Sequence, residues 1–230
     1  MLALTFSTGV VDAVGYLGLD RVFTANMTGN VVILGMALTG AEDLPVLGPC
    51  LALVAFVLGA ALVGRALRRA AKGWTTACTL VIALVGAGLA ALAGVTAALG
   101  DAIPVQEGAT PPPAALVVTA TLGLLMGAQA AAARRLAVKD VTTVVVTSTL
   151  TGLAADSRLA GGTGEGWRRR LGAVVLILAG AAAGAALLRW HVGAGLAVAA
   201  LITLTSALLG HRRARTRPQE PEPARENTLL

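Results

Sequence analysis

The chain carries a series of apolar runs, each long enough to cross a lipid bilayer. A transmembrane helix needs about 20 consecutive, predominantly apolar residues. Because lipid offers backbone N–H and C=O groups no partner, such runs cross a membrane as helices. Six segments of the sequence are of this kind: 2–19, 46–67, 75–99, 114–134, 171–188 and 193–210. The sequence therefore predicts an all-α, polytopic membrane protein.

The composition supports this class and argues against others. Of the 230 residues, 56% are hydrophobic and 13% are charged, which is typical of a membrane protein and not of a soluble domain. The net charge of +6 does not indicate a nucleic-acid partner, because Lys and Arg gather in short clusters between apolar runs. Cys50 and Cys78 lack metal-like spacing, so we expect no disulfide, metal or cofactor.

Two further segments, 22–41 and 141–155, are apolar but rich in Thr and Gly, and the second is short for a crossing. Cytoplasmic loops of membrane proteins are enriched in Lys and Arg. All four basic clusters face the cytoplasm if 141–155 enters and returns on that side. The clusters are Arg65, Arg68, Arg69 and Lys72; Arg134, Arg135 and Lys139; Arg158 with Arg168, Arg169 and Arg170; and Arg212, Arg213, Arg215 and Arg217.

The segment 22–41 has two interpretations. If it re-enters from the outer side, the N-terminus is cytoplasmic; if it spans fully, the N-terminus lies outside, and charge leaves both open. We expect six to seven spanning helices with one or two broken or re-entrant segments and a cytoplasmic C-terminus. The membrane domain would cover 1–210, and the Arg-, Glu- and Pro-rich segment 211–230 would be a disordered tail.

The two Thr- and Gly-rich segments resemble each other. VFTANMTGN at 22–30 matches VVTSTLTGL at 145–153, and GVVDA at 9–13 matches GAQAA at 127–131. On the topology above, the helices that precede the two matches cross in opposite directions. The halves, about 1–100 and 113–210, would then form an inverted repeat, with which many transporters build a site near the membrane midplane. Chance similarity in an Ala-, Thr- and Val-rich chain is the alternative.

In each copy a Thr-Gly pair is expected to interrupt its helix, because glycine leaves the helical conformation easily. The pairs are Thr28-Gly29 and Thr151-Gly152. Threonine side chains can cap the backbone groups that such a break frees. The candidates are Thr24, Thr28, Thr147 and Thr151. Asn30 has Leu153 as its counterpart and Asp12 has no carboxylate counterpart beside Gln129, so the first copy would hold most of the chemistry.

These residues also carry a family resemblance. The pattern Gly9-x-x-Asp12-Ala13, Phe23-Thr24 and Met27-Thr28-Gly29-Asn30 resembles the signature of the YoaK-like family of bacterial integral membrane proteins, a domain of unknown function. The resemblance covers nearly the whole chain up to the tail. It implies a multi-pass protein of the bacterial inner membrane with six or seven helices, and it supplies no substrate.

Asp12 is the residue most at odds with its surroundings. A carboxylate at a helix centre costs about 2.5–3.5 kcal/mol on insertion scales, and no Lys or Arg at membrane depth is available to pair with it. One interpretation is a group that couples transport to protons or a cation. The other is a structural contact with a Thr or Asn of a neighbouring segment, and the sequence leaves both open.

The candidate solute- or ion-binding residues are Asp12 and the polar or glycine positions of the two copies. They are Asp12, Tyr16, Thr24, Asn26, Thr28, Gly29, Asn30, Gln129, Thr147, Thr151 and Gly152. Their polar side chains could bind a small polar solute, or could hold helices together at about 0.6 kcal/mol per contact. Gly180 and Gly184 form a GxxxG pattern, which indicates close helix packing within a subunit or between the subunits of a homo-oligomer.

We do not expect an enzyme, because Asp12 stands alone at membrane depth without a second carboxylate, a Ser–His pair or a metal set. The expected function is a small transporter or channel-like permease for a small polar solute or ion, coupled to protons or a cation through Asp12. The alternative is a non-transporting scaffold or regulatory protein that acts through helix packing. A water-accessible cavity at Asp12 would favour the first function, and a dry interface the second.

Overall fold

The computed structural model describes residues 2–40, 44–71, 73–100, 111–136 and 146–216. All eight apolar segments contain a helix, which confirms the all-α class. The helices are α1 (Leu2–Gly18), α2 (Met27–Ala37), α3 (Leu47–Ala66), α4 (Thr76–Leu99), α5 (Pro113–Arg135), α6 (Val146–Ala155), α7 (Trp167–Leu188) and α8 (Val192–Thr216), with a short 3-10 helix at Arg158–Ala160.

Five helices, α3, α4, α5, α7 and α8, are long and apolar enough to cross a membrane. The first helix, α1, has 17 residues, at the short end of the range for a crossing. The helices α2 and α6, with 11 and 10 residues, are too short to span. The finding is a polytopic membrane protein with five long candidate spans and three shorter apolar helices.

The distribution of side chains is that of a protein in lipid. Large apolar side chains point outward on the long helices, as on Val57 of α3 and Leu178 of α7, which are 62% and 70% exposed. Polar side chains lie inside instead. The buried polar residues include Thr5, Ser7, Thr8, Asp12, Thr24, Asn30, Thr96, Thr119, Gln129 and Thr203. Because polar groups in lipid need internal partners, this inside-out pattern agrees with the composition.

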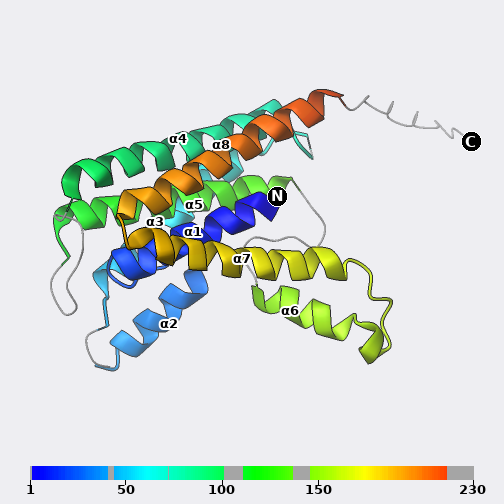
Figure 1. Ribbon diagram of the computed structural model, residues 1–230, viewed down its shortest axis with the longest axis horizontal. Coiled ribbons are helices and arrows are strands. Elements are labelled where there is room, and N and C mark those ends of the chain that lie inside the picture. The colour runs from blue at the N-terminus through cyan, green and yellow to red at the C-terminus, as the bar shows by residue number, and fades with distance from the viewer. Residues whose placement is uncertain (1, 41–43, 72, 101–110, 137–145, 217–230) are drawn as a thin grey trace, which may run out of the picture.

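The long helices form pairs. In the bundle, α1 packs on α7, α3 packs on α5 and α4 packs on α8. The helices α1 and α5 run in opposite directions, and so do α7 and α3 (Figure 1). Glycines bring the first two pairs close, since a Cβ at any of four glycines would lie within 3.0 Å of a backbone carbonyl on the facing helix. The four contacts join Gly9 to Ile177, Gly180 to Phe6, Gly127 to Phe56 and Gly59 to Leu124.

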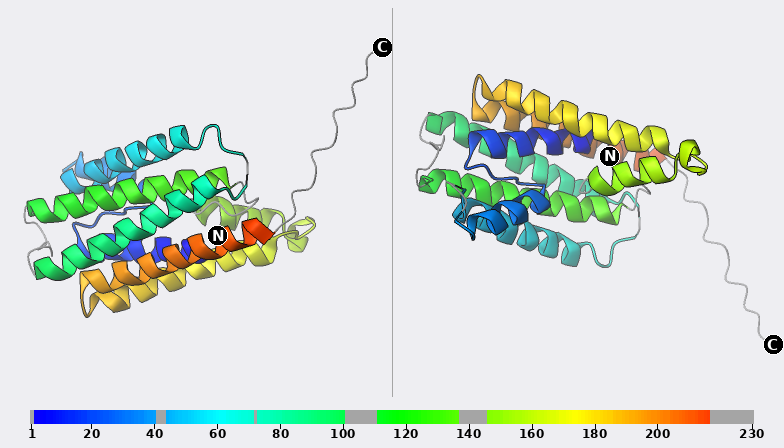
Figure 2. Two further views of the ribbon diagram at one scale, coloured as in Figure 1. Left: turned by 90° about the horizontal axis from the view of Figure 1, so that it is seen from above. Right: turned by 90° about the horizontal axis from the view of Figure 1, so that it is seen from below.

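The GxxxG pair of α7 therefore packs within the chain, because Gly184 also meets α1, at Val10. The basic clusters gather at one end of the bundle, where α3, α5 and α8 end and α7 begins (Figures 1 and 2). Arg135 ties two of these ends together by donating to the carbonyls of Arg68 and Ala70. Lys72, Lys139 and Arg217 lie outside the described residues.

The short helices α2 and α6 begin near each other at mid-height of the bundle and diverge toward opposite ends (Figure 1). The chain leaves α1 at Gly18, turns at Arg21, whose φ is 47°, and runs back without helix until α2 starts at Met27. Gly15 makes room for this return, because a Cβ there would lie 2.5 Å from the Val22 carbonyl oxygen.

Two expectations are corrected by these bounds. Thr28-Gly29 and Thr151-Gly152 lie inside α2 and α6, so the Thr-Gly pairs do not interrupt a helix; the interruption in the first half precedes α2. The tail also begins later than expected, since α8 continues to Thr216. Arg213 and Arg215 in its last turn are favourably placed at the negative end of the helix dipole. Residues 217–230 lie outside the described part of the chain.

Candidate functional site

The carboxylate of Asp12 holds the non-helical segment that precedes α2. Its Oδ1 accepts hydrogen bonds from the backbone N–H groups of Thr24 at 3.0 Å, Ala25 at 2.7 Å and Asn26 at 3.4 Å. The side chain is 9% exposed, and its bonds to Thr24 and Ala25 are buried while that to Asn26 is partly buried. Hydrogen bonds to an ionised acceptor are about twice as strong as neutral ones. Asp12 thus stabilises non-helical backbone within the fold.

Asn30 holds the same segment from the other side. Its Oδ1 accepts from the Phe23 backbone N–H at 2.9 Å, and its Nδ2 donates to the Phe23 carbonyl at 2.6 Å. Gly29 leaves room for the Phe23 ring, which a Cβ at Gly29 would meet at 2.5 Å. The same ring packs on Tyr16 with 4.9 Å between ring centroids. Most of the motif residues therefore shape the returning segment.

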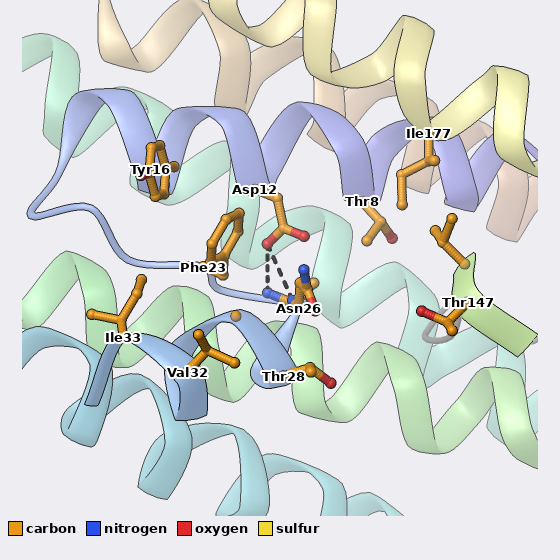
Figure 3. A pocket seen from close by; sticks show the side chains of 13 residues that line it. Thr8, Asp12, Tyr16, Phe23, Asn26, Thr28, Val32, Ile33, Thr147 and Ile177 are labelled. Atoms are coloured by element: carbon orange, nitrogen blue, oxygen red, sulfur yellow. Dashed lines mark hydrogen bonds between the residues drawn. The ribbon is translucent and has the colours of Figure 1, made fainter. Parts of the chain in front are cut away.

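A cavity of about 440 Å³ lies beside this segment, between the N-terminal ends of the two short helices (Figure 3). Thr28 and Gly29, in the first turn of α2, and Val146 and Thr147, the first residues of α6, contribute to its wall. Its full lining is Thr8, Asp12, Tyr16, Phe23, Ala25, Asn26, Thr28, Gly29, Val32, Ile33, Val146, Thr147 and Ile177.

The electrostatics of the cavity are set by one carboxylate and the N-terminal end of α2. Among the lining residues that the structure describes, Asp12 alone is an Asp, Glu, Lys or Arg. Its Oδ2 has no hydrogen-bond partner among the described residues, because the three backbone donors all go to Oδ1. A helix N-terminus carries about half a positive charge from its aligned peptide groups. The cavity therefore combines a free carboxylate oxygen with the electropositive end of α2.

The structure brings six of the candidate residues to the cavity and places five away from it. Asp12, Tyr16, Asn26, Thr28, Gly29 and Thr147 line it, whereas Thr24, Asn30, Gln129, Thr151 and Gly152 do not. Thr24 and Asn30 are fully buried. Gln129 is buried and donates to Thr8 Oγ1 at 3.2 Å. The Gly152 carbonyl accepts from Arg170 Nη1 at 2.6 Å.

The sequence reasoning missed Thr8 and the apolar wall. Thr8 lies four residues before Asp12 and so projects from the same face of α1, a signal that was available. Ile177 comes from α7 and Val146 from α6, and their place at the cavity depends on packing between distant segments. Apolar residues in an apolar run give no sign of such a role.

Comparisons with known proteins agree with the resemblance. A family model described as "Protein of unknown function (DUF1275)" matches residues 1–209. The UPF0700 transmembrane protein YoaK of Bacillus subtilis (strain 168) is 31% identical over 154 residues, which span 66% of this chain and 64% of that protein. The aligned region thus covers less than two thirds of the relative. No solved structure gives a significant match.

Proposed function

The chain belongs to the DUF1275 family of proteins of unknown function, and from the geometry of the cavity we propose that it is a small transporter or channel-like permease. The solute is a small polar molecule or ion, and Asp12 couples its passage to protons or a cation. The cavity is the observation that carries the proposal. Its volume of about 440 Å³ lies in the range of about 300–1,000 Å³ for small-molecule sites.

The position of this cavity favours transport over a structural role. Non-helical backbone at membrane depth is tolerated where it is buried in protein or lines a watery cavity. The segment before α2 does both, since Asp12 and Asn30 hold it and Ala25 and Asn26 line the cavity. Short helices that begin at mid-height and point their N-termini at a common site are a recurrent device of transporters.

An inverted repeat is part of the proposal, and the glycine contacts support it. Gly9 and Phe6 of α1 contact α7. The residues 118 positions later, Gly127 and Leu124 of α5, contact α3 in the same way. The residues that they contact on α3 are Phe56 and Gly59. These correspond to the contact residues of α7 that lie 121 positions later, Ile177 and Gly180. The short helices follow the same scheme, because α2 packs on α3 and α6 on α7. Chance similarity between the two halves would not reproduce the same contacts at both of these sequence offsets.

The orientation is proposed from charge. With the basic end of the bundle in the cytoplasm, α6 re-enters from the cytoplasmic side, α2 from the outside, and both termini are cytoplasmic. This assigns α1, α3, α4, α5, α7 and α8 as six crossings. It also places the protein in the bacterial inner membrane with its basic loops inside.

A scaffold that transports nothing is the second candidate, and a specific observation favours it. The bonds of Asp12 Oδ1 and Asn30 to backbone groups explain both residues without a solute. A screen for solutes that raise the Tm of the purified protein, followed by uptake of each stabilising solute into proteoliposomes, separates the two. Uptake of a stabilising solute supports the permease; stabilising solutes that are never taken up support the scaffold.

A further inference from the structure

We propose that the cavity binds a small zwitterion with an aliphatic side chain, a molecule whose protonated amine and carboxylate are attached to the same carbon atom. This inference rests on the proposed function, because it names the solute class of the same cavity. Three features of the lining carry it: the free oxygen of Asp12, the N-terminal end of α2, and an apolar wall.

Asp12 would bind the amine group of the ligand. An ionised carboxylate in a low-dielectric site needs a cationic partner, and the described lining contains no Lys or Arg. Oδ1 is already engaged by three backbone donors, which leaves Oδ2 to accept from a ligand. The hydroxyl of Thr8, one turn earlier on the same face of α1, lies in the same part of the wall. The Thr8 hydroxyl already donates to the Leu4 carbonyl and accepts from Gln129 Nε2, so Oδ2 of Asp12 is the main acceptor for an ammonium group.

The N-terminal end of α2 would bind the carboxylate group, with hydroxyl donors from both short helices. N-terminal ends of helices bind anions, because unpaired N–H groups and the helix dipole both point at the ligand. The N–H groups of Met27 and Thr28 have no hydrogen-bond partner among the described residues, and the side chain of Asn26 does not cap this end. Thr28 and Thr147 add hydroxyl donors from α2 and α6. These donors would weaken the binding of a solute that carries only positive charge.

The remaining wall is aliphatic and aromatic. Val32 and Ile33 come from α2, Val146 from α6 and Ile177 from α7, with Phe23 beside them. Such a wall favours an apolar side chain beside the two charged groups over a sugar or another polyhydroxylated solute, whose hydroxyl groups would stay unpaired. The combination therefore points to an amino acid with an aliphatic side chain.

The test compares three forms of one molecule on the purified full chain in lipid nanodiscs at about pH 7, where an α-amino group is still largely protonated. L-leucine carries both charges, L-leucine methyl ester the positive one and N-acetyl-L-leucine the negative one. Midpoints of thermal stabilisation should show at least about tenfold tighter binding of L-leucine than of either derivative. Equal or tighter binding of either derivative, or no binding of any of the three, would overturn the zwitterion assignment.

A variant pair locates the amine site. Asp12→Asn keeps an oxygen for the three backbone donors but removes the charge, so L-leucine should bind at least tenfold more weakly while N-acetyl-L-leucine is unaffected. Asp20→Asn, in the turn after α1 and outside the lining, should change neither; an unaltered preference in Asp12→Asn overturns the amine site. If the protein takes up some other class of solute, the zwitterion assignment alone is refuted. If none of the stabilising solutes is taken up, the proposed transport function is refuted.

Discussion

The side chain of Asn30 pairs with both backbone groups of Phe23, accepting from its N–H at 2.9 Å and donating to its C=O at 2.6 Å. This is how a neighbouring β-strand would satisfy the same residue. One amide side chain thereby replaces the secondary structure that the returning segment lacks. The Met-Thr-Gly-Asn motif is explained by this pairing together with the space that Gly29 leaves for the Phe23 ring.

Replacing Asn30 should therefore destabilise the fold more than replacing a nearby asparagine. In Asn30→Leu, two partly buried backbone groups of Phe23 lose their partners, at up to about 1–3 kcal/mol each, and the Tm should fall by several degrees. Asn26 is exposed and makes no side-chain hydrogen bond, so Asn26→Leu serves as the matched control with little change. Equal losses in the two variants would show that the pairing contributes nothing specific.

The sequence predicted the long helices well because a membrane span depends on local composition. The bounds of α3, α4 and α5 differ from the expected runs by one residue at each end or less. A contact of Asp12 with a Thr or Asn of a neighbouring segment was one of two interpretations, and Thr24 and Asn26 make it; the sequence did not indicate that their backbone N–H groups, and that of Ala25, would be the donors. Which backbone groups face a side chain depends on how a loop folds back, and no local pattern encodes that.

The Thr-Gly pairs illustrate the same limit. Glycine is compatible with a helix break and also with close packing, and only the neighbours decide between them. The ring of Phe23 occupies the space at Gly29, and the Arg170 guanidinium lies 3.0 Å from a Cβ built at Gly152. Both glycines are helical, so they serve packing, and the cavity forms one turn before Thr151-Gly152, at Val146 and Thr147.

Glycine-to-alanine substitutions should test the repeated packing. Gly59→Ala and Gly180→Ala each place a methyl group against a facing backbone carbonyl and should lower the Tm by similar amounts, because the two contacts are equivalent in the two halves. Gly64 in α3 and Gly172 in α7 have nothing within 4 Å of a Cβ. Alanine there should stabilise by up to about 1 kcal/mol through helix propensity. A large loss in one half alone would argue against the repeat.

Cysteine labelling should test the orientation, in a chain whose Cys50 and Cys78 are replaced by Ala. Ala71 follows the end of α3 and Thr163 precedes the start of α7, both at the basic end, whereas Thr39 follows the end of α2, which points to the other end (Figure 1). In intact cells an impermeant thiol reagent should label Thr39→Cys and spare Ala71→Cys and Thr163→Cys, which react once the membrane is opened. Labelling of Thr163→Cys but not Ala71→Cys in intact cells would mean that α6 does not return to the side it came from.

Two substitutions at Asp12 should separate its structural role from its charge. Asp12→Ala leaves the buried N–H groups of Thr24 and Ala25 and the partly buried one of Asn26 without an acceptor, and it should lower the Tm by several degrees, at about 1–3 kcal/mol per buried group that loses its partner. Asp12→Asn retains the acceptor and should melt at or above the wild-type temperature. If the charge couples transport, uptake by Asp12→Asn loses its pH dependence. A folded Asp12→Asn protein with an unchanged pH profile of uptake would refute the coupling role.

The central claim is that the cavity between α2 and α6 lies on a solute pathway, and it can be tested without knowing the solute. Thr28→Cys and Thr147→Cys, in the chain without native cysteines, place thiols on opposite walls of the cavity. The rate of modification by an impermeant thiol reagent should be measured from each side of the membrane, in right-side-out and inside-out vesicles. A pathway predicts that both thiols react from both sides. Protection of both thiols from both sides would contradict the account and identify the region as a dry interface.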